Sequence, residues 1–330
     1  MTHRLLTAVA ALALTAPSAA QDKPPAPAEI PSPGDIVAAA PAGDWVAIAA
    51  SDLLVMDLAP DAAGRPRRVV IQLMPAPFSQ GWIGNIRKLA AAHWWDGTSI
   101  NRVQDNYVVQ WGDATEKKPL PAGLAVVPEG EYVTATKAEG GVIPSDGKLP
   151  PMHWSGYSPG WAWTDHADAY AKKYSYFRGW PFAGDDGRSG WPVHCYGMVG
   201  VGRNMPPDTG SGAELYTVIG HAPRHLDRNI ALVGRVVSGI EHLSSLPRGT
   251  GGLGFYENEN ERVPIASIRI ASDLPPAEQP KFEYLSTESR SFAKYADARA
   301  NRRDPFFIKP AGEADICNIP VPVRAVADSR

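Results

Sequence analysis

The sequence is poor in cysteine and in long apolar runs, and its charges are nearly balanced. It has 2 cysteines among 330 residues, with 32 Lys and Arg against 35 Asp and Glu. Beyond the N-terminus, no segment reaches the roughly 18 apolar residues that a membrane-spanning helix needs. A near-neutral chain also lacks the basic excess of a nucleic-acid-binding protein. We therefore expect no membrane anchor and no nucleic-acid partner, and we expect a monomer.

Metal-ligand motifs are also missing from the sequence. His153, His166 and His194 are scattered, without the spacing that places several ligands around one ion. We therefore expect neither a metal site nor another cofactor.

The N-terminal residues have the pattern of a secretory signal peptide. Arg4 makes the start basic, residues 5–16 are apolar, and the small residues Ser18, Ala19 and Ala20 precede Gln21. The apolar run is too short for a permanent membrane helix, and no cysteine follows it to carry a lipid. We predict a signal peptide over 1–20 and a periplasmic or secreted mature protein.

The two cysteines, Cys195 and Cys317, are far apart in the sequence. In an exported protein such a pair favours a disulfide, which here would join the core to the C-terminal tail. Two buried free thiols are the alternative. The dipeptide His194-Cys195 also raises the question of a thiol nucleophile with a base, but neighbouring side chains on a strand point to opposite faces, which favours a structural cysteine.

The first third of the chain has clear local patterns. Residues 23–35 are rich in Pro and Ala and predict an extended linker. We therefore interpret 21–65 as a linker and N-terminal extension, with a short helix from Ile36 onward. Residues 53–58 and 69–73 predict a strand hairpin. Apolar residues recur at helical spacing over 78–92.

Residues 94–113 combine a predicted hairpin with an isolated cation. Alternation from Ile100 predicts a strand, Asp105-Asn106 a turn, and the following residues through Gln110 a second strand. Arg102 lies on a predicted strand in a mostly apolar setting, where an unpaired guanidinium is costly. A salt bridge is the common explanation for such a residue.

Several sequence blocks, in order, resemble the cyclophilin-type peptidyl-prolyl isomerases. The segment around Arg102 resembles the family stretch that carries the catalytic Arg, an aromatic residue five positions on and a Gln three further. The other blocks are 68–73 with 85–89, 212–220, 225–227 and 234–240. The resemblance covers roughly 68–113 and 194–270, and it is to a divergent, exported bacterial type.

This resemblance implies a mainly β fold, a closed eight-stranded antiparallel β-barrel capped by two helices. The domain would span 66–270, with 265–270 as its closing strand and an insertion at 114–193. A C-terminal extension over 271–330 would contain a charged helix at 287–303, on which 306–308 would dock.

The insertion contains half of the ten tryptophans: Trp154, Trp161, Trp163, Trp180 and Trp191. Aromatic side chains dominate small cores, so we favour packing of the insertion against the barrel. The alternative is an aromatic shelf beside the active site. Residues 162–174 could form a short helix.

The resemblance also implies a peptidyl-prolyl isomerase that acts on proline-containing polypeptides and assists the folding of exported proteins. Arg102 would be the catalytic residue, stabilising the twisted prolyl amide. The implied substrate-binding residues are Tyr107, Gln110, Val201, Gly202, Arg203, Glu214, Tyr216 and His225.

Four substitutions relative to the family bear on that activity. Tyr216 stands in place of a pocket Phe, and His225 in place of a Trp. Glu214 replaces a Gln and would lie near Arg102, where it would either hold the guanidinium or neutralise it. Glu214 and His225, together with Ile230 in place of a frequent His, keep open a second function, a non-catalytic binding module or chaperone for proline-containing segments. A glycan-binding protein with exposed tryptophans is a third.

Two competing motifs are weaker. Residues 156–160 match G-x-S-x-G, but the residue after the serine is Pro159, which has no N–H to donate to an oxyanion. The glycine-rich run 249–254 opens no βαβ unit, so it predicts a flexible loop and not a nucleotide-binding one.

Overall fold

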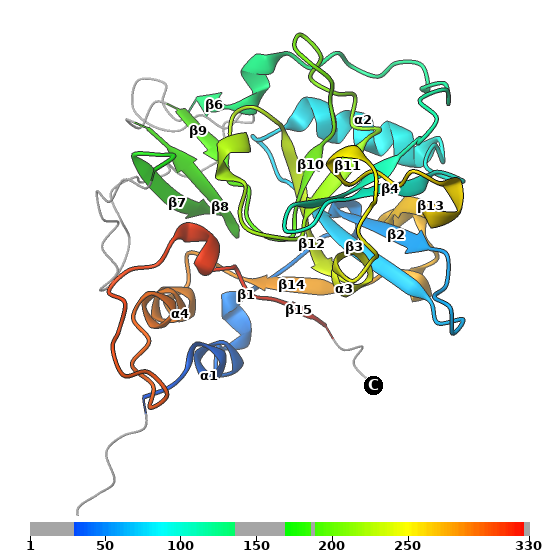
Figure 1. Cartoon of the computed structure of the whole chain (residues 1–330). Coiled ribbons are helices and arrows are strands. Elements are labelled where there is room, and N and C mark those ends of the chain that lie inside the picture. Colours follow the sequence, from blue (N-terminus) through cyan, green and yellow to red (C-terminus); the bar gives the residue numbers. More distant parts are fainter. Residues whose placement is uncertain (1–29, 136–168, 186–188, 327–330) are drawn as a thin grey trace, which may run out of the picture.

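The centre of the protein is a closed barrel of antiparallel strands (Figure 1). The computed structural model describes residues 30–135, 169–185 and 189–326. The barrel order is β10-β11-β5-β4-β13-β2-β3-β12. Its strands are β2 (Leu53–Leu58), β3 (Arg67–Leu73), β4 (Ser99–Val103), β5 (Val108–Gly112), β10 (Met198–Val201), β11 (Leu215–Val218), β12 (Leu232–Ser238) and β13 (Val263–Ile270). The expected mainly β, eight-stranded barrel is confirmed.

The predicted hairpin of β2 and β3 is covered on both faces. Leu54 and Met56 point into the barrel core, whereas Leu53 and Val55 belong to an outer cluster with Tyr284. Two covered faces explain why β2 is apolar at every position except Asp57. Because β2 also pairs with β13, the barrel begins at Leu53, earlier than residue 66 where we expected the domain to start.

Helix α2 (Gln80–Ala91) covers one end of the barrel, as its periodicity predicts. Trp82, Ile86 and Leu89 are fully buried in the barrel core. The indole N–H of Trp82 donates to the Gly210 carbonyl at 3.0 Å, which fixes the loop before β11 against the helix. A second, short helix, α3 (Glu241–Ser244), contributes Leu243 to the same core.

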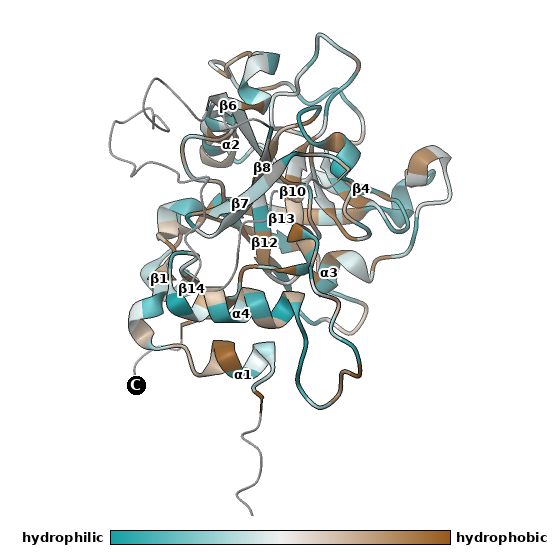
Figure 2. Cartoon of the chain, turned by 90° about the vertical axis from the view of Figure 1, so that its left-hand side faces the viewer, coloured by the Kyte–Doolittle hydropathy of each residue, from teal (hydrophilic) through white to brown (hydrophobic). Residues whose placement is uncertain are grey.

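The N- and C-terminal extensions form one additional layer. Strand β1 (Trp45–Ala47) pairs with β14 (Phe282–Leu285), which pairs with β15 (Val323–Ala325). Helices α1 (Pro33–Ala38) and α4 (Arg290–Ala300) lie together on this layer, away from the barrel (Figures 1 and 2). Helix α4 was predicted, within 287–303. The short helix expected from Ile36 onward instead begins at Pro33, inside the expected linker, where Ser32 caps its N-terminus. The expected docking of 306–308 is wrong for two of the three side chains, because Phe306 and Ile308 are 84% and 102% exposed.

The described part of the insertion is a sheet of order β6-β9-β8-β7. Trp180 and Trp191 are each 1% exposed, so these two tryptophans pack in the interior as favoured. The other three lie outside the described residues. A helix over 162–174 is wrong at its C-terminal end, because residues 173 and 174 begin a strand paired with β8. The strands are β6 (Thr134–Ala135), β7 (Lys173–Phe177), β8 (Trp180–Gly184) and β9 (Ser189–Pro192).

A disulfide between Cys195 and Cys317 joins the C-terminal tail to the segment that precedes β10. The predicted signal peptide lies outside the described residues, as does the start of the linker. Within the described ranges, no helix is both long and apolar enough to cross a membrane.

Candidate functional site

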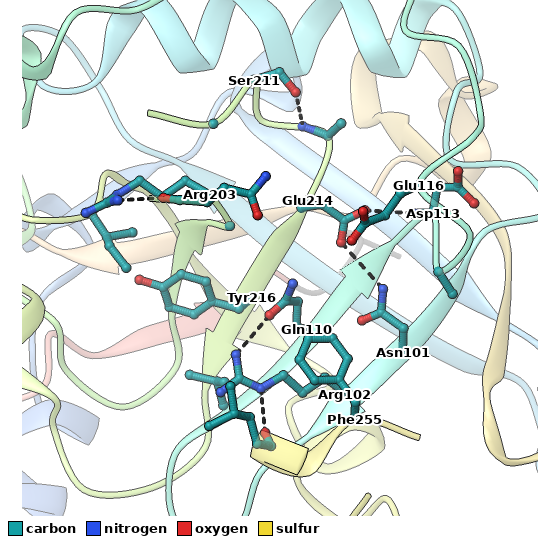
Figure 3. Close-up of a pocket in the computed structure, with 18 of the residues that line it drawn as sticks. Asn101, Arg102, Gln110, Asp113, Glu116, Arg203, Ser211, Glu214, Tyr216 and Phe255 are labelled. Atoms are coloured by element: carbon teal, nitrogen blue, oxygen red, sulfur yellow. Dashed lines mark hydrogen bonds between the residues drawn. The ribbon is translucent and has the colours of Figure 1, made fainter. Parts of the chain in front are cut away.

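A groove of about 760 Å³ runs over the outer face of β4, β5 and β11 (Figure 3). Seven of the nine predicted catalytic and substrate-binding residues line it: Arg102, Tyr107, Gln110, Gly202, Arg203, Glu214 and Tyr216. The other two do not. Val201 is fully buried in the barrel core because its side chain points inward, and His225 is exposed and stacks its ring on Tyr107.

Strand register brings the central residues of the groove into one row. Arg102 on β4 is paired with Gln110 on β5, and Gln110 is paired with Tyr216 on β11. Alternate residues of a strand point to opposite faces. Their neighbours Val109 and Leu215 therefore fill the barrel core, while this row faces the groove.

The guanidinium of Arg102 is held by neutral oxygens. Its Nε donates to the Leu253 carbonyl at 2.7 Å, its Nη1 to Gln110 Oε1 at 3.2 Å, and its Nη2 to Gln104 Oε1. The rings of Tyr107 and Phe255 lie 5.7 and 5.3 Å from its Cζ.

No carboxylate in the described part of the chain forms an ion pair with Arg102, so the salt-bridge explanation does not apply. Partial burial lowers the pKa of Arg102, and the nearby hydroxyls of Tyr107 and Tyr216 oppose that change. Arginine stays protonated in proteins at neutral pH. The groove therefore contains a fixed, uncompensated positive charge.

An apolar pocket lies beside this charge. Tyr216, which is 5% exposed, forms its floor with Val108, and Leu226 and Ile230 complete its wall. The Tyr216 hydroxyl occupies space left by a glycine: a Cβ on Gly200 would lie 2.3 Å from that oxygen. Gly200 thus permits Tyr in place of the smaller Phe that the family resemblance implies here.

The buried hydroxyl of Tyr216 is satisfied by a chain of side chains that sequence reasoning missed. It lies 2.8 Å from His194 Nε2, and His194 Nδ1 lies 2.8 Å from Asp227 Oδ1. Arg224 Nε donates to the other Asp227 oxygen at 2.7 Å. All four residues are buried.

The proton positions in this chain follow from its surroundings. Burial raises the pKa of Tyr216 well above its usual range, so it remains a phenol. Burial also lowers the pKa of His194, against the opposing effect of Asp227, so the ring is neutral. We assign the ring proton to Nδ1, facing Asp227, and Tyr216 then donates to Nε2. The arrangement fixes the orientation of the pocket floor.

Glu214 does not neutralise Arg102. Its Oε1 accepts from the Asp113 backbone N–H at 2.7 Å, and its Oε2 from the Asn101 amide at 3.5 Å. A Cβ on Gly112 would lie 1.8 Å from Oε1, so only glycine leaves room for this carboxylate. Burial raises the pKa of Glu214, and these hydrogen bonds oppose the rise. Glu214 is therefore positioned by neutral donors. The Gln110 side chain is a third one, and its amide oxygen accepts from Arg102.

The glycine-rich loop 249–254 also belongs to the site. It supplies Leu253, and Phe255 follows it; both contact Arg102. Gly254 has φ +81°, and a Cβ there would lie 2.8 Å from the Val103 carbonyl. The sequence predicted only a flexible loop here, although glycine is the residue that permits such a close backbone approach.

The remaining sequence motifs add no described residue to this groove. The G-x-S-x-G match at 156–160, with His153 and His166, lies outside the described residues. Among those that are described, no group of three or more His, Cys, Asp and Glu could hold a metal ion. Cys195 is in the disulfide and is not a thiol.

Comparison with known proteins agrees with this geometry. The model of the family described as cyclophilin type peptidyl-prolyl cis-trans isomerase/CLD matches residues 67–272. The chain is similar to a crystal structure of the cyclophilin AquaCyp293 from Hirschia baltica, with 20% identity and a TM-score of 0.61 over 87% of this chain and 95% of that one.

A cyclophilin type peptidyl-prolyl cis-trans isomerase from Cryptosporidium parvum, crystallised in the presence of the dipeptide Ala-Pro, is more distant. It has 10% identity and a TM-score of 0.36, over 66% of this chain and 98% of that one. No curated protein matches the sequence. From the family match over most of its length, the chain belongs to the cyclophilin-type peptidyl-prolyl cis-trans isomerases, enzymes that act on proline-containing peptides.

Proposed function

We propose that Arg102 is the catalytic group of this isomerase, and that its clients are exported proteins. Rotation about an X–Pro bond is slow because the amide C–N bond has partial double-bond character. As the bond twists, the lone pair returns to the prolyl nitrogen, where a fixed cationic donor stabilises it. No nucleophile or cofactor is needed for this reaction.

The observation that carries the proposal is the state of Arg102: charged, oriented by neutral oxygens, and adjacent to an apolar pocket of the kind a proline ring needs. A positioned donor of this type is worth about 10²–10³-fold in rate in other enzymes. The rings of Tyr107 and Phe255 shield the guanidinium from water on two sides, which strengthens its effect.

A proline isomerisation assay on a tetrapeptide tests the role of Arg102. We expect Arg102→Ala to lose about 10²–10³-fold in kcat/KM. Arg65→Ala is the matched control, since that exposed arginine pairs with Asp61 outside the groove. Unchanged turnover in Arg102→Ala would contradict the assignment. If the wild-type protein bound the peptide without turnover, the binding-module function would replace the enzyme function.

Two features support the proposed export. The N-terminal 20 residues have the signal-peptide pattern, and a structural disulfide is typical of oxidising compartments. Fractionation of cells that express the full chain, next to a variant lacking residues 2–20, tests it. We expect the full chain outside the cytoplasm and the shortened variant inside. Retention of both in the cytoplasm would contradict export.

A further inference from the structure

The groove continues from the floor of the proline pocket to Glu214. Glu214 immediately precedes β11 and is two positions from Tyr216, so both side chains face the groove. In Figure 3, Glu214 lies on the far side of Gln110 from Arg102. Positions two apart on a strand are separated by about 6.7 Å. An extended peptide covers this distance in about two residues. A peptide whose proline lies on Tyr216 therefore brings a side chain two residues away to Glu214.

The Glu214 carboxylate has donors as its partners. The Asp113 N–H and the Asn101 amide N–H both favour its ionised form. The absent side chain of Gly112 leaves the space in which the carboxylate lies. The negative charge is thus held at a defined point on the wall of the groove.

Asn101 provides a second acceptor at the same place. Its side chain is 6% exposed and lines the groove, and its Oδ1 has no hydrogen-bond partner among the described residues. The Glu214 carboxylate and the neighbouring Asn101 amide oxygen are both hydrogen-bond acceptors, so a ligand that binds both must supply donors. Lys and Arg side chains carry donors only, together with a positive charge.

The groove lining contains cations as well as Glu214: Arg262 is one, and Arg203 donates its guanidinium N–H groups to the backbone carbonyls of Asn204 and Asn229. Asp113 and Glu116 also line it. The nearby cation Lys118 donates to the Asp96 carbonyl at 2.7 Å and lies 5.6 Å from the Trp94 ring. Over the described ranges, Glu214 has no ion-pair partner.

We propose that Glu214 and Asn101 form a subsite for a Lys or Arg side chain about two residues from the substrate proline. This inference rests on the proposed function, because the position of the proline is taken from it. The subsite selects among proline-containing segments and takes no part in the twisting of the amide.

The test uses peptides that contain one Ala-Pro bond and differ at a single position, two residues before or two residues after the proline. That position carries Lys, Gln or Glu. Isomerisation is measured by NMR exchange, and binding is measured separately by fluorescence anisotropy. The protein variants are Glu214→Gln, which keeps an acceptor for the Asp113 N–H, and the matched control Glu116→Gln, which removes an exposed charge from the same groove.

We expect the Lys peptide to exceed its Gln counterpart about tenfold in kcat/KM at one of the two positions, with the Glu peptide lowest. The preference disappears in Glu214→Gln, persists in Glu116→Gln, and decreases in wild type as salt is raised. Equal rates for Lys and Gln at both positions, or a preference that survives in Glu214→Gln, would overturn the subsite.

The binding measurement separates this inference from the proposed function. If no peptide is isomerised, the proposed function fails, and the anisotropy data still decide the charge preference. If all peptides are isomerised equally and bound equally, only the subsite fails.

Discussion

Arg102 in the groove and Arg235 at the junction of barrel and insertion have closely similar partners. Arg235 donates to Gln72 Oε1 at 2.9 and 2.7 Å and to the Gly179 carbonyl at 2.6 Å, and its Cζ lies 4.5 Å from the Trp180 ring. Each arginine thus has a Gln oxygen, a backbone carbonyl and aromatic rings, and neither has an ion pair in the described structure.

The two arginines differ in their access to water. Arg235 is 7% exposed, and burial lowers its pKa to about 10. Arg102 opens into the groove. An arginine held by neutral partners therefore joins parts of the fold when it is enclosed, as Arg235 is. It presents its charge to a ligand when one side is open, as in Arg102. A carboxylate would prevent the second role by neutralising the cation.

Arg235→Ala gives the largest expected effect on stability. The substitution leaves a cavity. It also removes the guanidinium N–H groups that donate to Gln72 Oε1 and to the Gly179 carbonyl, so we expect the free energy of unfolding to fall by about 3–5 kcal/mol. Urea denaturation measures the loss, and a fall below about 1 kcal/mol would show that Arg235 does not join barrel and insertion. The activity of the folded fraction should stay at the wild-type level.

Removal of the Gln partners compares the two sites directly. Gln72→Leu leaves two buried guanidinium N–H groups without an acceptor, for an expected cost of about 2–3 kcal/mol. Gln110→Leu should cost less than about 1 kcal/mol, because water replaces the lost acceptor of Arg102. Equal losses in thermal or urea unfolding would contradict the difference in water access.

Arg102→Lys tests whether charge alone is sufficient in the groove. A lysine keeps the charge but cannot bond Leu253, Gln104 and Gln110 in a fixed plane. We expect kcat/KM to fall about tenfold, equivalent to about 1.4 kcal/mol, with unfolding unchanged. Wild-type activity in this variant would mean that orientation of the guanidinium is unimportant.

The smallest effect concerns Glu214. The pKa of Glu214 is raised in the folded protein, so its ionisation destabilises the fold at pH values above that raised pKa. Below the ordinary Glu value, near 4.3, the carboxyl is protonated in both states and has no such effect. We expect Glu214→Gln to be more stable than wild type at pH 7 by less than about 1 kcal/mol, and equal to it below pH 4. An ion pair with Arg102 would reverse the sign at pH 7, which pH-dependent denaturation would detect.

Local patterns predicted much of the fold. Alternation predicted the hairpin around Arg102, helical spacing predicted α2, and a charged segment indicated α4. The family resemblance implied the closed barrel. These features depend on residues that are close in the sequence or on a known order of blocks.

The partners of the site residues were not predictable in the same way. His194 meets Tyr216 and Asp227, 22 and 33 positions away, and Leu253 meets Arg102 across 151 positions. Such pairs are fixed only when the barrel closes. The sequence therefore suggested Glu214 as a neighbour of Arg102, whereas the strand register places it opposite Gly112.

The shared sheet of the two extensions bears on how the chain is synthesised. Strand β1 ends at residue 47, but its partner β14 begins at residue 282. The chain therefore leaves β1 without its hydrogen-bonding strand until the whole barrel, which ends at residue 270, has been synthesised. β2 pairs at once with β3, only a few residues later. The barrel thus has an early local start, whereas the layer that covers it is completed last.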